Sequence, residues 1–478
     1  MAETPCRDAR AREARDLRVL DLLCRLVRIK TEHGEPAPGT PYGEGCALAL
    51  TFVLEECAAR GFKIRRVDDK IAWAEVGDHG PLAAFPVHLD VIPATGVWTH
   101  DPYAAKIDGG VLYGRGCMDD KIGAATMVEL IGELAAEWRE AGRELPCRLR
   151  IIFGTDEETG MSDMRGYVDA GEEQPALGFV PDAMFPGIRG EKARLHLRLS
   201  RSLSAECGVV VDAGTMVNVV PDRAEATVDA SHVRPEVLEA LLADLPEGLE
   251  TMVLDEGVRV VANGRAAHGS TPERGVNAAR RLVGHLVASG VDVLCEDEGA
   301  ACVPLSLGRL NDLLCGDLAG EALGIDVPDE TFGHTSMNLG RLSLGGGFVV
   351  AELDVRFGSG ISADEVVTRV ATALGEPWEV EVVRAKPLHL VPEDDPCLCA
   401  LLAAYRRVTG DDAEPEVMAG GTYASYLGAL CAFGPKLPGT HSGAHGIDEH
   451  VSLENTSMAT EVYRVALRNL VELAEGMR

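Results

Sequence analysis

The chain has 478 residues, 46% of them hydrophobic and 25% charged, which is the composition of an ordinary globular protein with two or three domains. Acidic residues outnumber Lys and Arg by 76 to 45, and the net charge of -31 argues against a nucleic-acid partner, because phosphate binding needs a basic surface. The sequence shows neither a membrane span of roughly 18 apolar residues nor a signal region, so we expect no membrane partner and a cytoplasmic protein whose 13 scattered cysteines are reduced.

Helical and strand patterns alternate along the first part of the chain. This alternation predicts an α/β protein with a mixed or parallel sheet. Apolar spacing gives predicted helices at 9–31, 45–60 and 121–141, and predicted strands at 72–76, 82–88, 148–154 and 177–183.

Acids and a histidine stand at the ends of these apolar runs, where folding alone does not require them. The passages are HLDVIP at His88, GRGCMDDK at Asp119, GTDEETG with two adjacent glutamates, and FVPDA at Asp182. Ligand sites of open α/β sheets form outside the carboxyl ends of the strands, so we expect these side chains to converge. Taken singly, the same residues are more simply a surface histidine, a helix N-cap and a solvated turn.

The middle of the chain lacks acidic strand ends and contains two passages that look like copies of one unit. Each gives strand, turn, strand and helix, with Asn218 and Asn338 at the same place. Either the unit is duplicated or two β-hairpins share an AE dipeptide by chance. The first passage has strands at 215–221 and 224–230, and the second has them at 335–340 and 351–357.

From about residue 386 the sequence is again rich in glycine and acidic residues, and a helix is predicted at 396–409. The final passage, THSGAHGIDEH, offers His441, His445 and His450 as candidate ligands. We therefore expect the C-terminal segment to rejoin the first domain. The predicted division is a catalytic domain of residues 1–190 and 386–478 with a lid domain of residues 191–385 inserted into it.

The charges of these groups suit two divalent cations. Two cations contribute +4, and Asp119, Glu158, Asp182 and a bridging hydroxide contribute -4, with His88 and His445 neutral. Without cations the three carboxylates repel one another at short range. Glu157, adjacent to Glu158, is then a candidate general base for the remaining proton.

Six passages in this order resemble one known family over nearly the whole chain. They are HLDVIP, PYAAKIDGGVLYGRGCMDDK, GTDEETG, FVPDA, AAHGSTPERGVNA and AHGIDEH. The chain resembles the dinuclear zinc metallopeptidases, which include aminoacylases, desuccinylases and dipeptidases, and is most similar to their dipeptidase V (Sapep-type) branch. The resemblance implies a mixed-sheet di-metal catalytic domain with an inserted α+β lid domain made of two similar subdomains, in a monomer.

The resemblance assigns the metal ligands residue by residue. His88, Asp119 and Asp182 would hold one ion, and Asp119, Glu158 and His445 would hold the other, with Asp119 bridging. Zn²⁺ is the expected ion, with Mn²⁺ and Co²⁺ as alternatives. The family also implies a cis peptide bond after Asp119. His441 stays an alternative to His445, because this chain departs from the family after its last ligand histidine.

The resemblance also assigns the catalytic and substrate-binding groups. Glu157 would be the general base, and Asp90 would orient the first ligand histidine. His268, on a glycine-flanked loop of the lid, and Asn218 would stabilise the oxyanion, whereas Arg356 would bind the substrate's carboxylate.

Three functions remain open. The first is a dipeptidase that hydrolyses unblocked dipeptides through a metal-bridging hydroxide. The second is an amidohydrolase acting on N-acyl or N-succinyl amino acids. The third is an inactive binding protein, which a missing base or ligand would indicate, and every proposed position here has a suitable side chain.

Overall fold

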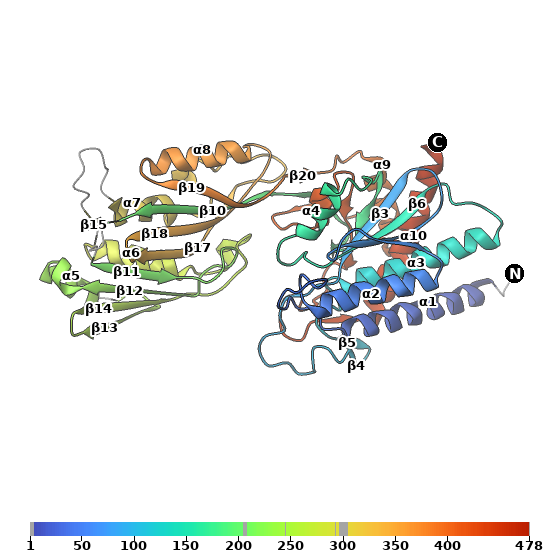
Figure 1. Ribbon diagram of the computed structural model, residues 1–478, viewed down its shortest axis with the longest axis horizontal. Coiled ribbons are helices and arrows are strands. Elements are labelled where there is room, and N and C mark those ends of the chain that lie inside the picture. Colours follow the sequence, from blue (N-terminus) through green and yellow to red (C-terminus); the bar gives the residue numbers. More distant parts are fainter. Residues whose placement is uncertain (1–3, 204–207, 244, 292, 296–304, 478) are drawn as a thin grey trace. The chain divides into compact units, whose positions relative to one another are not determined.

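The computed structural model describes residues 4–203, 208–243, 245–291, 293–295 and 305–477 (Figure 1). Two compact units account for the chain. The first comprises Met1–Glu191, His389–Val417 and Gly421–Arg478, and the second comprises Lys192–Leu388 and Met418–Gly420. Over the described residues, the structure contains no helix long and apolar enough to cross a membrane.

A nine-stranded mixed sheet forms the centre of the first unit. Its order is β1-β2-β6-β3-β7-β22-β9-β20, with β21 paired to β9. Strands β6, β3, β7 and β22 run parallel, so their carboxyl ends meet at one edge. The strands are β1 (Lys63–Arg66), β2 (Ala72–Val76), β3 (Leu82–His88), β6 (Arg148–Gly154), β7 (Leu177–Val180), β9 (Ile188–Glu191), β20 (His389–Leu390), β21 (Glu416–Met418) and β22 (Cys431–Ala432).

Small strands outside this sheet fix two loops. Strand β24 pairs with β5 and β5 with β4, whereas β23 pairs with β8. The bounds are β4 (Lys106–Asp108), β5 (Val111–Tyr113), β8 (Ala183–Met184), β23 (Pro435–Lys436) and β24 (His450–Ser452).

Helices cover both faces of the central sheet. Phe85 and Ile151, on one face of β3 and β6, join the main apolar core with residues of α1, α2, α3, α9 and α10. On the other face, Arg150 of β6 donates to the hydroxyl of the buried Tyr167 in α4 at 2.9 Å. The helices are α1 (Thr4–Val27), α2 (Glu44–Ala59), α3 (Lys121–Glu140), α4 (Ser162–Asp169), α9 (Pro396–Thr409) and α10 (Leu453–Gly476).

Close approach of β7 to β3 depends on one glycine. Gly178 has φ 130°, and a Cβ there would lie 2.0 Å from the carbonyl oxygen of Ala84. A side chain at this position would therefore push the two strands apart. The absence of one keeps the ends of β3 and β7 side by side, which the site requires.

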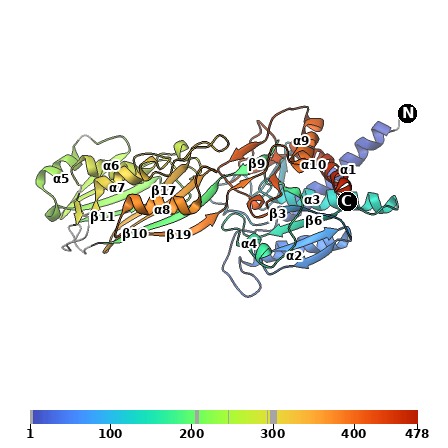
Figure 2. The same ribbon diagram turned by 90° about the horizontal axis from the view of Figure 1, so that it is seen from above.

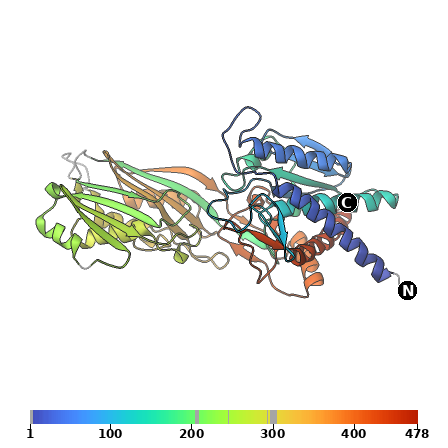
Figure 3. The ribbon, with the colours of Figure 1, turned by 90° about the horizontal axis from the view of Figure 1, so that it is seen from below.

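An eight-stranded sheet, β13-β14-β12-β11-β17-β18-β10-β19, forms the second unit. Its strands alternate buried and exposed residues, because four helices cover only one face. Figures 2 and 3 show these helices gathered along one side of the sheet. The elements are β10 (Ala193–Ser202), β11 (Val209–Ala213), β12 (Arg223–Asp229), α5 (Pro235–Leu242), β13 (Leu249–Leu254), β14 (Gly257–Asn263), α6 (Ala278–Ala288), α7 (Leu307–Leu314), β17 (Ser336–Gly345), β18 (Phe348–Phe357), α8 (Ala363–Leu374) and β19 (Glu379–Lys386), beside the short pair β15 (Val293–Cys295) and β16 (Leu305–Ser306).

The α/β fold class is confirmed, but one predicted strand is wrong. Residues 215–221 form a loop, although their composition favours a strand. The Asn338 side chain donates to the carbonyl oxygens of Val217 and Val219, each at 3.0 Å, and so replaces the bonds of a neighbouring strand. Asn218 and Asn338 are therefore not equivalent, since Asn338 lies in β17. The strand-then-helix parts of the two passages do recur, as β12 with α5 and β18 with α8.

Candidate metal centre

Three neighbouring parallel strands deliver most of the predicted ligands to one edge of the sheet. His88 is the last residue of β3, the turn with Glu157 and Glu158 follows β6, and Asp182 follows β7. Asp119 arrives from the loop before α3, and its peptide bond to the next residue is cis, as the resemblance implied.

His88 links two of the carboxylates. Its Nε2 atom lies 2.9 Å from Oδ1 of Asp119 and 3.6 Å from Oδ2 of Asp182. Its Nδ1 atom lies 2.9 Å from the backbone oxygen of Asp90 and 3.5 Å from the Asp90 carboxylate. Asp90 thus fixes the His88 ring mainly through its main chain, which leaves Nε2 turned toward the acids.

His445 joins the other pair of acids. Its Nε2 atom lies 3.0 Å from Oδ2 of Asp119 and 3.1 Å from Oε2 of Glu158. Asp119 therefore contacts both histidines, one through each carboxylate oxygen. His441, the alternative ligand, instead stacks on His450 with ring centroids 6.1 Å apart, so the contacts favour His445.

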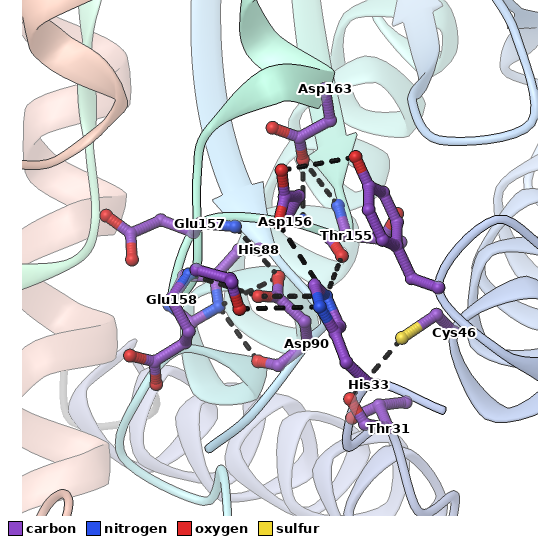
Figure 4. Close-up of polar contacts among 12 residues, drawn as sticks. Thr31, His33, Cys46, His88, Asp90, Thr155, Asp156, Glu157, Glu158 and Asp163 are labelled. Carbon is purple, nitrogen blue, oxygen red and sulfur yellow. Dashed lines mark hydrogen bonds and ion pairs between the residues drawn. The ribbon is translucent and has the colours of Figure 1, made fainter. Parts of the chain in front are cut away.

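Two buried aspartates hold the turn that carries the paired glutamates. The Asp90 carboxylate accepts the amide N–H groups of Glu157 at 3.2 Å and Glu158 at 3.1 Å. Asp163, from α4, accepts the amide of Thr155 at 2.6 Å. In Figure 4 the carboxylates of the two glutamates point away from Asp163, toward the same side of the turn. The turn is thus fixed from its back while its acids face the site.

Glu449 holds the loop before Asp119. Its buried carboxylate accepts from the amides of Gly116 and Met118, each at 2.9 Å, and from the amide of Asp119 at 3.2 Å. Arg115 donates to it at 2.7 Å, which balances the buried charge. The Asp119 carboxylate therefore stands on a loop whose amides converge on a single acid.

Burial and like charge oppose ionisation of most acids in the cluster. Burial, with the charge of Asp119 next in importance, raises the pKa of Asp182 to about 7 and also raises the pKa of Glu158. Burial likewise raises the pKa of Glu157 well above its ordinary value, and Asp182 adds to the effect. For Asp119 burial acts in the same direction, but hydrogen bonds from the two histidines outweigh it and lower the pKa.

The geometry suits divalent ions. Metal–ligand bonds of about 2.0–2.2 Å place two atoms bound to one ion roughly 3–3.5 Å apart, close to the nitrogen–oxygen distances given above. Imidazole and carboxylate groups are the ligands that zinc and related ions take. Among the described residues, two sets have ligand atoms within 4.8 Å of one another: His88 with Asp119 and Glu158, and His88 with Glu157 and Asp182. Glu157 thus lies within ligand distance, although the sequence analysis assigns it the role of general base.

The predicted substrate-binding residues belong to the second unit. Asn218 and His268 are neighbours there, because the amide of Gly269 donates to the Asn218 carbonyl at 2.7 Å. His268 is exposed, and its Nδ1 atom lies 2.6 Å from Oγ of Ser270. The catalytic role of these two residues stays a prediction.

Arg356 is buried rather than open. Its guanidinium donates to the Asp354 carboxylate at 2.8 Å and to the carbonyl oxygen of Ala419 at 2.7 Å. Asp354 therefore already supplies one carboxylate partner. Binding of a substrate carboxylate by Arg356 stays a prediction and would use the guanidinium N–H groups that these contacts leave over.

Sequence reasoning assigned no role to Glu449 or Asp163, which hold the segments that carry the acids of the cluster. The contacts of Glu449 join residues 330 or more positions apart, and no spacing rule reveals them. Asp163 lies five residues after Glu158, but a single acid in a helix N-terminus gives no signal of its own. The only sequence signal for Glu449 was its position four residues after His445.

Comparisons with known proteins agree on one family. The family model for peptidase family M20/M25/M40 matches residues 84–469. A Bacillus subtilis (strain 168) protein named "Putative dipeptidase YtjP" is 30% identical over 449 residues, which cover 91% of this chain and 93% of that protein. A Staphylococcus saprophyticus protein named "Putative dipeptidase SSP1012" is 30% identical over 474 residues, which cover 95% of this chain and 97% of that protein.

Solved structures share the fold at low identity. A metallo-carboxypeptidase of the M20 family, Sso-CP2 from Sulfolobus solfataricus, matches with a TM-score of 0.59 and 17% identity, over 95% of this chain and 99% of that one. Human carnosine dipeptidase 1 matches with a TM-score of 0.54 and 15% identity, over 97% and 98%. At these identities the likeness concerns the fold alone.

Proposed function

The chain belongs to peptidase family M20/M25/M40 and is a hydrolase, and from this premise we propose that it is a metal-dependent dipeptidase that cleaves unblocked dipeptides. Relatives with dipeptidase names support this choice among the substrates of the family. The observation that carries it is the convergence of His88, Glu158 and Asp182 at the carboxyl ends of three parallel strands, with ligand-like spacing around Asp119.

The proposed ligand sets follow the contacts. His88, Asp119 and Asp182 would hold one divalent ion, and Asp119, Glu158 and His445 would hold the other. Such ions would lower the pKa of a coordinated water to about 7. Zn²⁺ is our first choice, with Mn²⁺ and Co²⁺ as alternatives.

Glu157 would take and return protons during the reaction. Its amide is fixed by Asp90, so the main chain that carries the carboxylate is held in place, and its pKa is sensitive to the charge of its surroundings. A general base works best when its pKa lies near the working pH. His268 and Asn218 would stabilise the oxyanion after the second unit delivers them, and Arg356 would bind the substrate's carboxylate.

The test is a metal-content measurement combined with a dipeptide screen on the same sample. We expect two divalent ions per chain, release of free amino acids from dipeptides, and loss of the activity in EDTA with recovery on adding Zn²⁺, Mn²⁺ or Co²⁺. A broad dipeptide panel that gives no turnover with any of these ions would exclude the proposal.

The same assay separates the proposed dipeptidase from an amidohydrolase. Each dipeptide is compared with its N-acetylated form at equal concentration. We expect the free form to be the better substrate by at least about tenfold in kcat/KM, and the reverse order would favour the N-acyl amino acid class. Light scattering on the same sample tests the proposed monomer.

A further inference from the structure

A loop between α1 and α2 lies against the turn that carries the paired glutamates, and the proposed reaction does not use it. The carbonyl of Thr31 accepts the amide of Val91 at 3.2 Å and the thiol of Cys46 at 3.3 Å. Gly45 closes the other end, since a Cβ there would lie 1.8 Å from the carbonyl oxygen of Lys30. The loop is therefore fixed at both ends, on either side of residues 32–44.

His33 reaches from this loop to both ends of the turn. Its Nε2 atom lies 2.8 Å from the carbonyl oxygen of Thr155. A carbonyl only accepts, so Nε2 carries a hydrogen and donates it. The other ring nitrogen lies 3.3 Å from Oγ1 of Thr159. Thr155 and Thr159 bracket Glu157 and Glu158, so one imidazole spans the segment between them.

The ring of His33 is itself fixed. It stacks on Tyr42 with centroids 4.5 Å apart and an angle of 10° between the planes. The Tyr42 hydroxyl donates to Asp156 at 3.1 Å, and the amide of Gly34 donates to the Tyr42 carbonyl at 3.0 Å. Both rings therefore belong to one closed loop, and the imidazole has little freedom to turn away from the Thr155 carbonyl.

His33 also faces the acids behind the turn. Its Nε2 atom lies 3.8 Å from Oδ2 of Asp90 and 3.9 Å from Oδ1 of Asp156. Asp90 is the group that accepts the Glu157 and Glu158 amides, so the imidazole dipole acts on the same carboxylate that orients the turn. The hydrogen bond to the Thr155 carbonyl and the approach to Asp90 therefore both act on the turn that carries the two glutamates.

We propose that His33 is a positioning residue that fixes the direction of Glu157 and Glu158 through the Thr155 carbonyl and Asp90. The proposal rests on the proposed function for the roles of the two glutamates. A displacement of about 1 Å at such groups lowers a rate by up to roughly 100-fold. Loss of groups that orient metal ligands typically weakens metal affinity by about 10–100-fold.

The test compares His33→Ala and His33→Gln with the wild-type chain and with His79→Ala. His79 is a matched control because it is a half-exposed histidine of the same unit whose Nε2 atom approaches Glu144 only to 3.9 Å. For each protein we would titrate the metal-free form with Zn²⁺ in a calorimeter. We would then measure kcat, KM and Tm with both ions present.

His33→Ala should bind at least one ion about tenfold more weakly and lose about tenfold in kcat, with KM within about twofold, because the turn matters in the transition state. His33→Gln should recover to within about threefold of wild type, since its amide can still donate to Thr155. A purely structural role would lower Tm and leave kcat of the folded, metal-loaded enzyme unchanged.

Wild-type metal affinity and kcat in His33→Ala would overturn the proposal, as would a His33→Gln variant no better than His33→Ala. The outcome does not depend on the substrate assignment. If the wild-type protein binds two ions but cleaves no dipeptide, the proposed function fails, and the Zn²⁺ titration alone still decides the role of His33.

Discussion

At the residue scale, Glu157 shows how the same surroundings allow two roles. Its carboxylate lies within ligand distance of His88 and Asp182, and its amide is fixed by Asp90, which holds the main chain that carries it. A ligand is needed for metal binding, whereas a base is needed only for turnover. Replacing the carboxylate with an amide of the same shape separates the two.

Glu157→Gln should reduce kcat by about 10²–10⁴, the usual contribution of a general base, while two ions remain bound. The amide keeps the volume and cannot take a proton at neutral pH. Metal analysis and dipeptide turnover on one preparation check both halves. Loss of one ion in this variant would instead show that Glu157 is a ligand.

His196 gives the second unit a pH dependence of stability. It is buried on β10, with Asp354 at 3.7 Å and Arg194, Arg356 and Arg384 around it. Burial lowers its pKa to about 4, against the attraction of Asp354. The folded protein therefore binds fewer protons than the unfolded chain between about pH 4 and 6.5.

The free energy of unfolding of the second unit should consequently fall as pH drops from 6.5 to 4, by up to roughly 3 kcal/mol from this group. His196→Leu should remove most of that slope, because leucine does not titrate. Hydrogen exchange of the β10 and β18 amides at several pH values measures this pH dependence of the free energy of unfolding. An unchanged slope in the variant would assign the effect to the carboxylates.

At the element scale, ion pairs join helices that also share the apolar core. Glu129 of α3 is buried, with 5% of its surface exposed, and accepts from Arg18 of α1 at 3.0 Å and from Arg60, just after α2. Exposed pairs contribute little, but a buried acid whose partners converge on it is costly to disrupt. This acid therefore ties three helices together beneath the sheet.

Glu129→Gln should lower the free energy of unfolding by about 1–3 kcal/mol, because it leaves two arginines without their shared charge. Glu140→Gln is the control, since Glu140 lies exposed on the same helix and should change stability by less than about 0.5 kcal/mol. Urea denaturation, monitored by circular dichroism, measures the change in the free energy of unfolding for both variants. Equal effects of the two substitutions would contradict the argument.

At the scale of the whole molecule, metal binding and folding are linked. The cluster forms only when β3, β6 and β7 are paired, so ions that bind it stabilise the folded first unit. The buried acids whose pKa is raised add to this linkage, because a cation relieves their repulsion.

Saturation with Zn²⁺ at about 100 times its Kd should raise the free energy of unfolding by about 2.7 kcal/mol. For a unit of this size that corresponds to roughly 5–10 °C in Tm. Differential scanning calorimetry with EDTA and with Zn²⁺ measures the shift. Asp119→Asn should abolish most of it, and a full shift in that variant would place the ions elsewhere.

Local patterns were enough to predict the catalytic sheet, but not the contacts that hold it. The predicted strand bounds at 72–76, 82–88 and 148–154 match β2, β3 and β6, because continuous apolar runs ended by acids have few other structures. Helix α1 ends at Val27, four residues before its predicted end, since the carbonyl of Thr31 accepts the amide of Val91 instead. The loop at 215–221 depends on the side chain of Asn338, a partner that no local pattern reveals.

The insertion of the second unit has a consequence for how such a protein can change over time. Residue 191 and residue 389 are opposite neighbours in antiparallel strands, so apart from residues 418–420 the whole insertion begins and ends at one point of the sheet. A gene could lengthen, shorten or exchange that segment without moving the ion-binding edge out of register. On the proposal that the second unit carries the substrate-binding residues, preference for one substrate over another and the hydrolytic chemistry itself can diverge as separate heritable traits.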